Sequence, residues 1–235
     1  MGRVWLVVAS AAMVAGIGCG KQSYEKRLET TVETLRYKKR LNDNLMKEPS
    51  EKKFQDLAIY VRPPKEQALA KTGQLPVSEG QFELDASFND SKIDSTLHLL
   101  ARVKLPKKAP AKGAPPPPPP PQRGPFDADV LGVLSNVFGS PEGLQTPKFV
   151  EEVKRGNRFR RLIFVANDKE VKLYIYKQDN HEVALVFVYD PKQKAPLATK
   201  IDLCLDSFAA GAKATRLYAG GAPEEEAESG PVGPM

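Results

Sequence analysis

The sequence predicts an α+β fold, in which helices flank one antiparallel β-sheet, with a proline-rich insertion and a disordered C-terminal tail. Two segments carry apolar residues at helical spacing, and several others alternate apolar and polar residues as half-buried strands do. Two pairs of turn-forming residues, Asn167-Asp168 and Asp179-Asn180, join three of these strands in succession. Short turns between such segments are typical of antiparallel pairing.

The first expected element is a helix from Tyr24 to Met46, with Ser23 placed to cap its start. Apolar residues recur along it at helical spacing and then continue on a shifted stripe: Tyr24, Leu28, Val32 and Leu35, followed by Tyr37, Leu41 and Leu45. A basic cluster from Arg36 to Arg40 lies in the later half, where cations complement the helix dipole. We expect a solvated helix face; the alternative is electrostatic contact with an anionic membrane or wall polymer.

Three strands are expected in the first half of the chain, at Leu57–Arg62, Phe82–Phe88 and Thr96–Leu105. The first runs into Pro63-Pro64, where pairing must stop or lie at an edge, because proline has no amide hydrogen. The second alternates apolar and polar residues, and the third is nearly continuously apolar. Residues 19–105 therefore hold the N-terminal helix and the first strands.

Composition changes abruptly at residues 106–125, which hold ten prolines, seven of them consecutive from Pro115 to Pro121. Such a run adopts an extended polyproline II helix, with a rise of about 3.1 Å per residue. We expect a passive spacer or exposed loop; the alternative is a docking site for a proline-reading groove.

Residues 126–220 open with a helix expected from Asp127, which is placed to cap it, to Phe138, with Gly139 ending it. An antiparallel meander follows, with strands expected at Phe159–Ala166, Glu170–Lys177 and Glu182–Tyr189.

We expect both faces of this meander to be covered. On the first face we place Val171, Leu173 and Ile175, and we assign Val183, Leu185 and Phe187 to the matching face of the next strand. Tyr174, Tyr176, Val186 and Val188 then fall on the second face.

The end of the domain, Lys200–Ala209, fits either a strand or a short helix. Residues 221–235 are mainly Gly, Pro and Glu, which predicts a disordered acidic tail. After Cys19 only Cys204 remains, so no disulfide can form within the mature chain. Apolar neighbours on both sides of Cys204 indicate a buried, inert thiol.

Both halves run in the same order, a helix followed by three short strands, and we expect residues 19–105 and 126–220 to form one composite domain. This order resembles the PsbP-like fold, an α/β/α sandwich found in exported and thylakoid-lumen proteins. The resemblance rests on element order and implies no site.

Residues 1–18 have the layout of an export signal peptide, with Arg3 ahead of an apolar run that ends at Ile17. A membrane-spanning helix needs about 20 apolar residues, and this run is shorter. Ile17-Gly18-Cys19 resembles the end of a bacterial lipoprotein signal, whereas Gly16 departs from its first position. The resemblance implies cleavage before Cys19 and a lipid on that cysteine. The alternatives are an ordinary secretory signal and an uncleaved membrane anchor.

A lipidated Cys19 holds the mature protein on a membrane, either the cell membrane or the outer membrane, facing the periplasm or the exterior. The formal net charge of +6 suits anionic partners. Among these, nucleic acid fits an exported protein least. We therefore expect membrane contact through Cys19, partners among envelope proteins or anionic wall polymers, and no nucleic acid.

The sequence carries no recognisable motif for catalysis, metal or cofactor binding. Its two histidines, His98 and His181, lack metal spacing, and there is no Cys-x-x-Cys, Gly-x-Ser-x-Gly or phosphate loop. We expect each histidine to be hydrogen-bonded within the fold or solvated, and the protein to be a binding or assembly factor rather than an enzyme. The alternative is an envelope enzyme with dispersed catalytic residues, which a deep polar pocket lined by carboxylates or a histidine would favour.

A basic cluster surrounds Phe159 and consists of Lys154, Arg155, Arg158, Arg160 and Arg161. Charged residues on a strand protect a sheet edge from aggregation, which is the expected role. Arg158, Arg160 and Arg161 are also the candidate contacts for an anionic partner.

Overall fold

The computed structural model describes residues 18–49, 51–70, 75–90, 92–104 and 123–220. The chain divides into two compact units, Met1–Asp43 and Asn44–Met235. The predictions for the signal residues before Gly18, for the run Pro115–Pro121 and for the acidic tail lie outside the described residues.

The described part of the first unit is the helix α2, Gly18–Asn44, of 27 residues. At 1.5 Å per residue it is about 40 Å long. It begins six residues before the expected start at Tyr24, so Ser23 lies inside the helix instead of capping it. No helix among the described residues is both long enough and apolar enough to cross a membrane.

The second unit is built on a seven-stranded sheet in the order β2-β3-β4-β8-β7-β6-β5. All neighbours are antiparallel, which confirms the predicted fold class. The strands are β2 (Ala68–Leu69), β3 (Leu84–Asp90), β4 (Ser95–Val103), β5 (Val150–Lys154), β6 (Asn157–Ala166), β7 (Lys169–Gln178) and β8 (His181–Tyr189). The pairing of β4 with β8 joins the strands of both halves into a single sheet.

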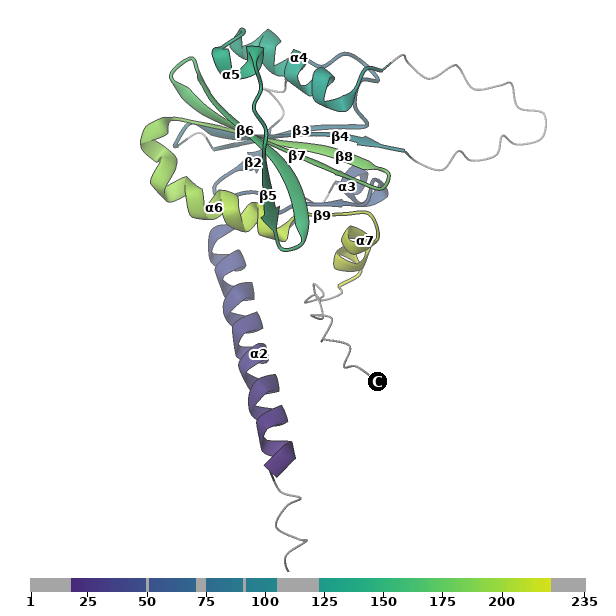
Figure 1. Cartoon of the computed structure of the whole chain (residues 1–235), viewed down its shortest axis with the longest axis vertical. Coiled ribbons are helices and arrows are strands. Elements are labelled where there is room, and N and C mark those ends of the chain that lie inside the picture. Colours follow the sequence, from purple (N-terminus) through teal and green to yellow (C-terminus); the bar gives the residue numbers. More distant parts are fainter. Residues whose placement is uncertain (1–17, 50, 71–74, 91, 105–122, 221–235) are drawn as a thin grey trace, which may run out of the picture. The chain divides into compact units, whose positions relative to one another are not determined.

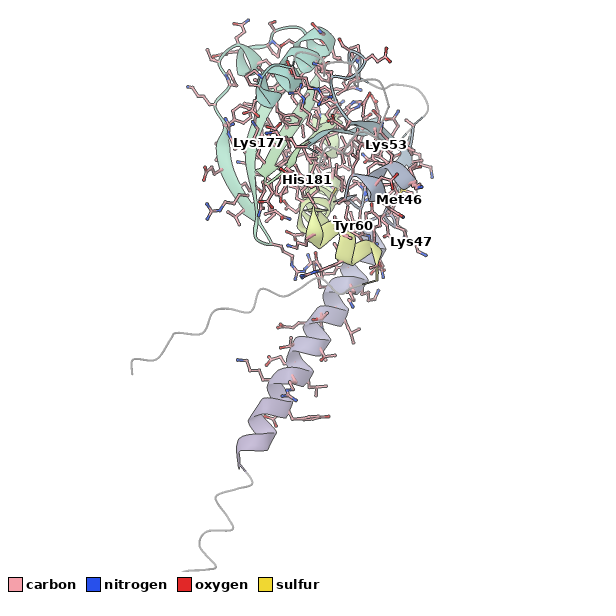
Figure 2. The ribbon with its side chains drawn as sticks, turned by 90° about the vertical axis from the view of Figure 1, so that its right-hand side faces the viewer. Met46, Lys47, Lys53, Tyr60, Lys177 and His181 are labelled. Carbon is pink, nitrogen blue, oxygen red and sulfur yellow. The ribbon has the colours of Figure 1, made fainter. Side chains whose placement is uncertain are left out.

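Helices cover both faces of this sheet (Figure 1). On one face lie α4 (Phe126–Phe138) and α5 (Glu142–Gln145), and on the other lies α6 (Lys194–Ser207), which follows the short 3-10 helix η1 (Pro191–Gln193). The remaining elements are α3 (Lys52–Asp56), α7 (Ala212–Tyr218) and a small sheet in which β1 (Ile59–Tyr60) pairs with β9 (Ala209–Ala210). Tyr60, which is labelled in Figure 2, packs edge-on against Tyr218 of α7, with ring centroids 5.3 Å apart.

Both predicted turns of the meander are present. Asn167, Asp168 and Asp179 have positive φ angles of 51°, 60° and 53°, which Asn and Asp adopt more readily than other side chains. The β6–β7 turn pairs Ala166 with Lys169, and the β7–β8 turn pairs Gln178 with His181.

The expected assignment of β8 to its faces is wrong. Leu173 lies opposite Val186 and Ile175 lies opposite Ala184, whereas Leu185 lies opposite Tyr174. The cause is the turn itself: residues 178 and 181 pair, so each odd-numbered residue of β7 faces an even-numbered residue of β8. Directly paired residues share a face, so Leu185 and Phe187 lie on the face opposite to Leu173.

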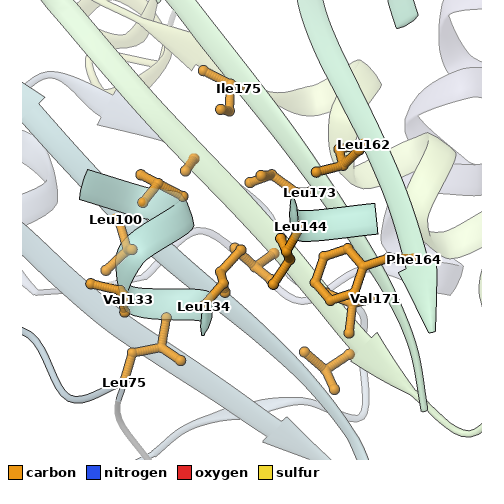
Figure 3. Packing of buried hydrophobic residues seen from close by; sticks show 14 of the residues in the cluster. Leu75, Leu100, Val133, Leu134, Leu144, Leu162, Phe164, Val171, Leu173 and Ile175 are labelled. Atoms are coloured by element: carbon orange, nitrogen blue, oxygen red, sulfur yellow. The ribbon is translucent and has the colours of Figure 1, made fainter. Parts of the chain in front are cut away.

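The main apolar core lies between the sheet and α4 with α5 (Figure 3). It contains Leu162 and Phe164 of β6, Leu173 of β7 and Leu134 of α4. The second face carries aromatic residues instead. Phe159 contacts the rings of Tyr174, Tyr176 and Phe208, and Phe187 contacts Tyr174. Both faces are therefore buried, as predicted.

Several element boundaries differ from the expected ones. α4 begins at Phe126 with Pro125 at its N-cap, so the prediction that Asp127 caps it is wrong; Asp127 instead pairs with Arg160 and Lys177. The region from Lys200 is part of α6 up to Ser207, and only its last residue enters β9. The first expected strand shrinks to the two residues of β1.

Candidate functional site

A hollow of about 320 Å³ opens on the α4 face of the sheet, beside the C-terminal end of α4. Four strands line it, β3, β4, β7 and β8, together with the β6–β7 turn, the end of α4 and Leu75 from the segment before β3. Its lining is Leu75, Asn89, Thr96, His98, Val137, Phe138, Asn167, Lys169 and Val188. The volume falls in the range of small-molecule sites, which begin at about 300 Å³.

The polar groups of the hollow come from side chains that alternate along β3 and β4. Leu84, Ala86 and Phe88 of β3 are buried on the α6 face, so Asp85, Ser87 and Asn89 point toward the α4 face. Thr96 lies opposite Asn89, and His98 lies opposite Ser87. This corner of the sheet is therefore polar, whereas the neighbouring surface under α4 is apolar.

Two polar side chains of the hollow differ in how the fold uses them. The Oδ1 atom of Asn89 is buried and has no hydrogen-bond partner among the described residues. Lys169 is held at the rim by an ion pair with Asp94, Nζ to Oδ2 2.8 Å. An unpaired buried acceptor costs about 1–3 kcal/mol, so a donor that reaches Asn89 gains more there than at an exposed amide.

His98 is a neutral hydrogen-bonding group in this hollow. Its Nδ1 lies 2.7 Å from Ser87 Oγ, and both side chains are buried. Burial lowers the pKa of His98 to about 4, because the charged imidazolium loses its hydration there. Burial also raises the pKa of Asp85, two residues before Ser87, although the charge of Lys53 opposes the shift.

The Ser87–His98 pair has the hydrogen-bond distance of a nucleophile and its base but not the accessibility. A serine nucleophile must be reachable by substrate, and Ser87 is fully buried. The hollow is lined by one histidine and no carboxylate. In the described part of the chain, no three His, Cys, Asp or Glu side chains converge as a metal site requires. The hollow therefore presents polar side chains that can form hydrogen bonds.

The basic cluster on β6 is divided between the two faces of the sheet. Arg160 forms a 2.5 Å ion pair with Asp127, and its guanidinium lies 4.3 Å from the ring centroid of Phe149. Arg161 points to the other face and donates to Glu152 at 2.7 Å. Arg158 is exposed and shares the face of Arg160. The three arginines therefore do not form one continuous basic surface.

The remaining residues considered from the sequence have structural surroundings. Cys204 is a buried free thiol, as predicted, and burial raises its pKa. His181 donates through Nε2 to the carbonyl oxygen of Leu57 at 3.0 Å. The backbone of Cys19 belongs to the first turn of α2.

Comparison with known proteins gives structural likeness alone. No family model matches the chain, and no curated protein matches it. The solution structure of cyanobacterial PsbP from Synechocystis is similar with a TM-score of 0.42 and 12% identity, over 72% of this chain and 93% of that one. The crystal structure of the Ran-binding protein Mog1p of Saccharomyces cerevisiae gives 0.34 and 11%, over 65% and 90%.

The first of these structures has the fold that the order of the sequence elements resembles. Because both TM-scores are below 0.5, neither likeness carries an argument about function.

Sequence reasoning singled out His98 but missed the residues around it. The available signal was the polar alternation of Asp85, Ser87 and Asn89, which places three hydrogen-bonding side chains on one face of a strand. Asn167 and Lys169 could not be assigned to this hollow from the sequence, because only the folded sheet and the β6–β7 turn bring them to the same hollow as residues of β3 and β4.

Proposed function

We propose that the protein is a lipid-anchored binding protein of the bacterial cell envelope, whose sheet domain takes a small polar ligand in the hollow at His98. The observation that carries this proposal is the convergence of two amides, a hydroxyl, a neutral imidazole and an ammonium on one concave surface. Small-ligand sites typically combine an apolar wall with a few such polar groups. Here Leu75, Val137 and Val188 supply the apolar wall.

The chemistry of the hollow favours a hydroxylated ligand with little charge. Amide side chains both donate and accept, and a neutral imidazole does the same, so they match hydroxyl groups. The ammonium of Lys169 is already paired with Asp94 and leaves little net charge for an anion. Sugar units of wall polymers have this character, and the predicted location places them within reach.

We expect a bulky residue at Val137 to weaken binding. Val137 is exposed at the wall of the hollow, so Val137→Trp fills the space without disturbing the core. Val153→Trp is the matched control, because Val153 is an exposed valine of β5 outside the hollow. Calorimetric titration with soluble disaccharide–peptide fragments of cell wall measures the effect. The expected loss is at least tenfold, about 1.4 kcal/mol, for Val137→Trp alone. Equal affinity of both variants would contradict the site.

The anchor belongs to the same proposal. Signal cleavage before Cys19 leaves α2, a helix of about 40 Å, directly behind the lipid. Two or more acyl chains are needed for stable attachment, and one diacylglyceryl cysteine supplies them. We expect mass spectrometry of the mature N-terminal peptide to find diacylglyceryl at Cys19, and Cys19→Ser to release the protein from the membrane fraction. An unmodified N-terminus at another residue, or wild-type protein in the soluble fraction, would contradict the proposed lipid anchor.

A further inference from the structure

The buried acceptor of the hollow, Asn89 Oδ1, begins a row of three neighbouring side chains. Asn89 of β3 is paired with Thr96 of β4, and Thr96 is paired with Val188 of β8. Paired residues share a face, so the three side chains lie side by side on the α4 face, on strands about 4.8 Å apart. An unpaired amide oxygen therefore lies next to side chains that carry methyl groups.

A hydrogen-bond donor lies at the rim of the same hollow. Lys169 Nζ contacts both carboxylate oxygens of Asp94, at 2.9 Å to Oδ1 and 2.8 Å to Oδ2. An ammonium has three N–H bonds, so one remains for a ligand. Asp94 belongs to the turn between β3 and β4, and Lys169 is the first residue of β7. This ion pair therefore crosses the end of the sheet where Asn89 and Thr96 lie.

An isolated buried acceptor is best matched by a group that donates a hydrogen bond and needs none at the same atom. A hydroxyl donates one hydrogen bond, but its lone pairs also need donors when they are buried. A secondary amide N–H only donates. In the planar trans amide of an acetamido group, the N–H and the methyl lie on one side and the carbonyl oxygen lies on the other. The hollow has the same arrangement, with an acceptor beside methyl groups and a donor at the rim.

We propose that the hollow selects N-acetylated sugars, and that Asn89 determines this specificity by accepting the N–H of the acetamido group. The inference rests on the proposed function, and it narrows the ligand from hydroxylated molecules in general to sugars that carry an acetamido group. The methyl of that group packs beside Thr96 and Val188. Its carbonyl oxygen accepts from Lys169.

Two matched disaccharides test the selectivity on the unmodified protein. N,N′-diacetylchitobiose and cellobiose differ only in having acetamido groups or hydroxyl groups at the same positions. Calorimetric titration of the full-length protein in detergent should show about tenfold tighter binding of N,N′-diacetylchitobiose, which corresponds to one hydrogen bond. Equal affinities, or tighter binding of cellobiose, would overturn the proposal.

Asn89→Leu removes the acceptor and keeps a branched side chain of similar length. The variant should bind N,N′-diacetylchitobiose about tenfold more weakly than wild type, and no more tightly than cellobiose. Asn180→Leu is the matched control, because Asn180 is exposed in the β7–β8 turn, at the opposite end of β8 from Val188. The control should keep the full preference. A preference that survives in Asn89→Leu overturns the role of Asn89.

The stability of the same variant distinguishes a ligand contact from a structural role. Asn89 Oδ1 has no hydrogen-bond partner among the described residues, so an apolar side chain at this position leaves no partner unsatisfied. The urea midpoint of Asn89→Leu should therefore equal or exceed that of wild type. A lower midpoint would show that the fold itself uses this side chain, and would count against the proposal.

The selectivity and the binding site fail in different ways. Equal binding of the two disaccharides that Val137→Trp weakens leaves the hollow as the site and contradicts its selectivity. Binding of disaccharide–peptide wall fragments without binding of either disaccharide has the same meaning. A protein that binds none of the three contradicts the proposed function together with the selectivity.

Discussion

Leu162→Ala is expected to lower the free energy of unfolding by about 2–5 kcal/mol, because it removes a large side chain from a packed core. Leu162 is 3% exposed and lies in the cluster between the sheet and α4 with α5. The loss is a large part of the 5–15 kcal/mol that holds a typical domain together. Urea titration of the two proteins measures it, with an unchanged slope showing that both unfold in the same way.

The next residue on the same strand is the control. Ile163 points to the opposite face and is 43% exposed, so Ile163→Ala should cost well under half as much. The comparison tests the strand register, since a slip of one residue would exchange the two side chains. Equal losses for Leu162→Ala and Ile163→Ala would show that the register of β6 is wrong.

Acid is expected to destabilise the protein through His98. In the unfolded chain this histidine takes up a proton near pH 6.5, whereas burial holds its folded pKa at about 4. Between these values the unfolded state binds the proton and the folded state does not, so stability falls as the pH drops from about 6.5 to about 4. The loss approaches about 3 kcal/mol at the lower end.

A pair of variants isolates this contribution. His98→Asn removes the titrating group but keeps a polar side chain next to Ser87, so the difference in stability between wild type and variant should change across this pH range. Ser87→Ala loses the 2.7 Å hydrogen bond and keeps the imidazole, so its stability should be lower while the pH dependence remains. Urea midpoints at pH 7 and pH 4.5 distinguish the two. A His98→Asn protein with the full acid dependence of the wild type would show that another group is responsible.

The turns of the meander could be read directly from the sequence, because Asn and Asp at Asn167-Asp168 and Asp179-Asn180 have few other reasons to interrupt alternating strands. The same turns also determine which residues of β7 and β8 share a face, and that assignment was nevertheless wrong. Two-residue turns pair odd with even positions, so Leu173 meets Val186, and numbering parity alone excludes Leu185 as its neighbour on that face.

Two other elements were missed or only partly predicted from the sequence, for physical reasons. β5 consists mostly of charged residues, Glu151, Glu152 and Lys154, so it shows no clear alternation of apolar and polar residues. In the fold, Glu152 pairs with Arg161, and Lys154 pairs with α6. The hairpin behind it turns at Arg155 and Gly156, both with positive φ, and arginine gives no turn signal. α6 begins at Lys194, six residues before the segment Lys200–Ala209 that was considered from the sequence. That segment holds only part of the helix, so the helical spacing of its apolar residues could not be recognised.

The candidate site shows the limit of sequence reasoning more clearly than the fold. His98 lies within an apolar strand, and nothing local separates a structural histidine from one that lines a hollow. The hollow appears only when α4 stops at Gly139, at a φ of 72°, and leaves the polar ends of β3 and β4 uncovered. The edge role expected for the basic cluster on β6 is wrong, because β6 is paired on both sides, with β5 and β7. The role of its arginines as contacts for an anionic partner stays a prediction.

Mapping the binding surface by NMR tests the central claim most directly. Amide shifts of the isotope-labelled sheet domain, followed during titration with disaccharide–peptide wall fragments, locate the contact without any mutation. Binding in the hollow predicts changes concentrated at Asn89, Thr96, Asn167 and Lys169, with those of Arg158 and Arg160 unaffected. Changes centred on Arg158 and Arg160, or an unchanged spectrum at saturating fragment, would contradict it.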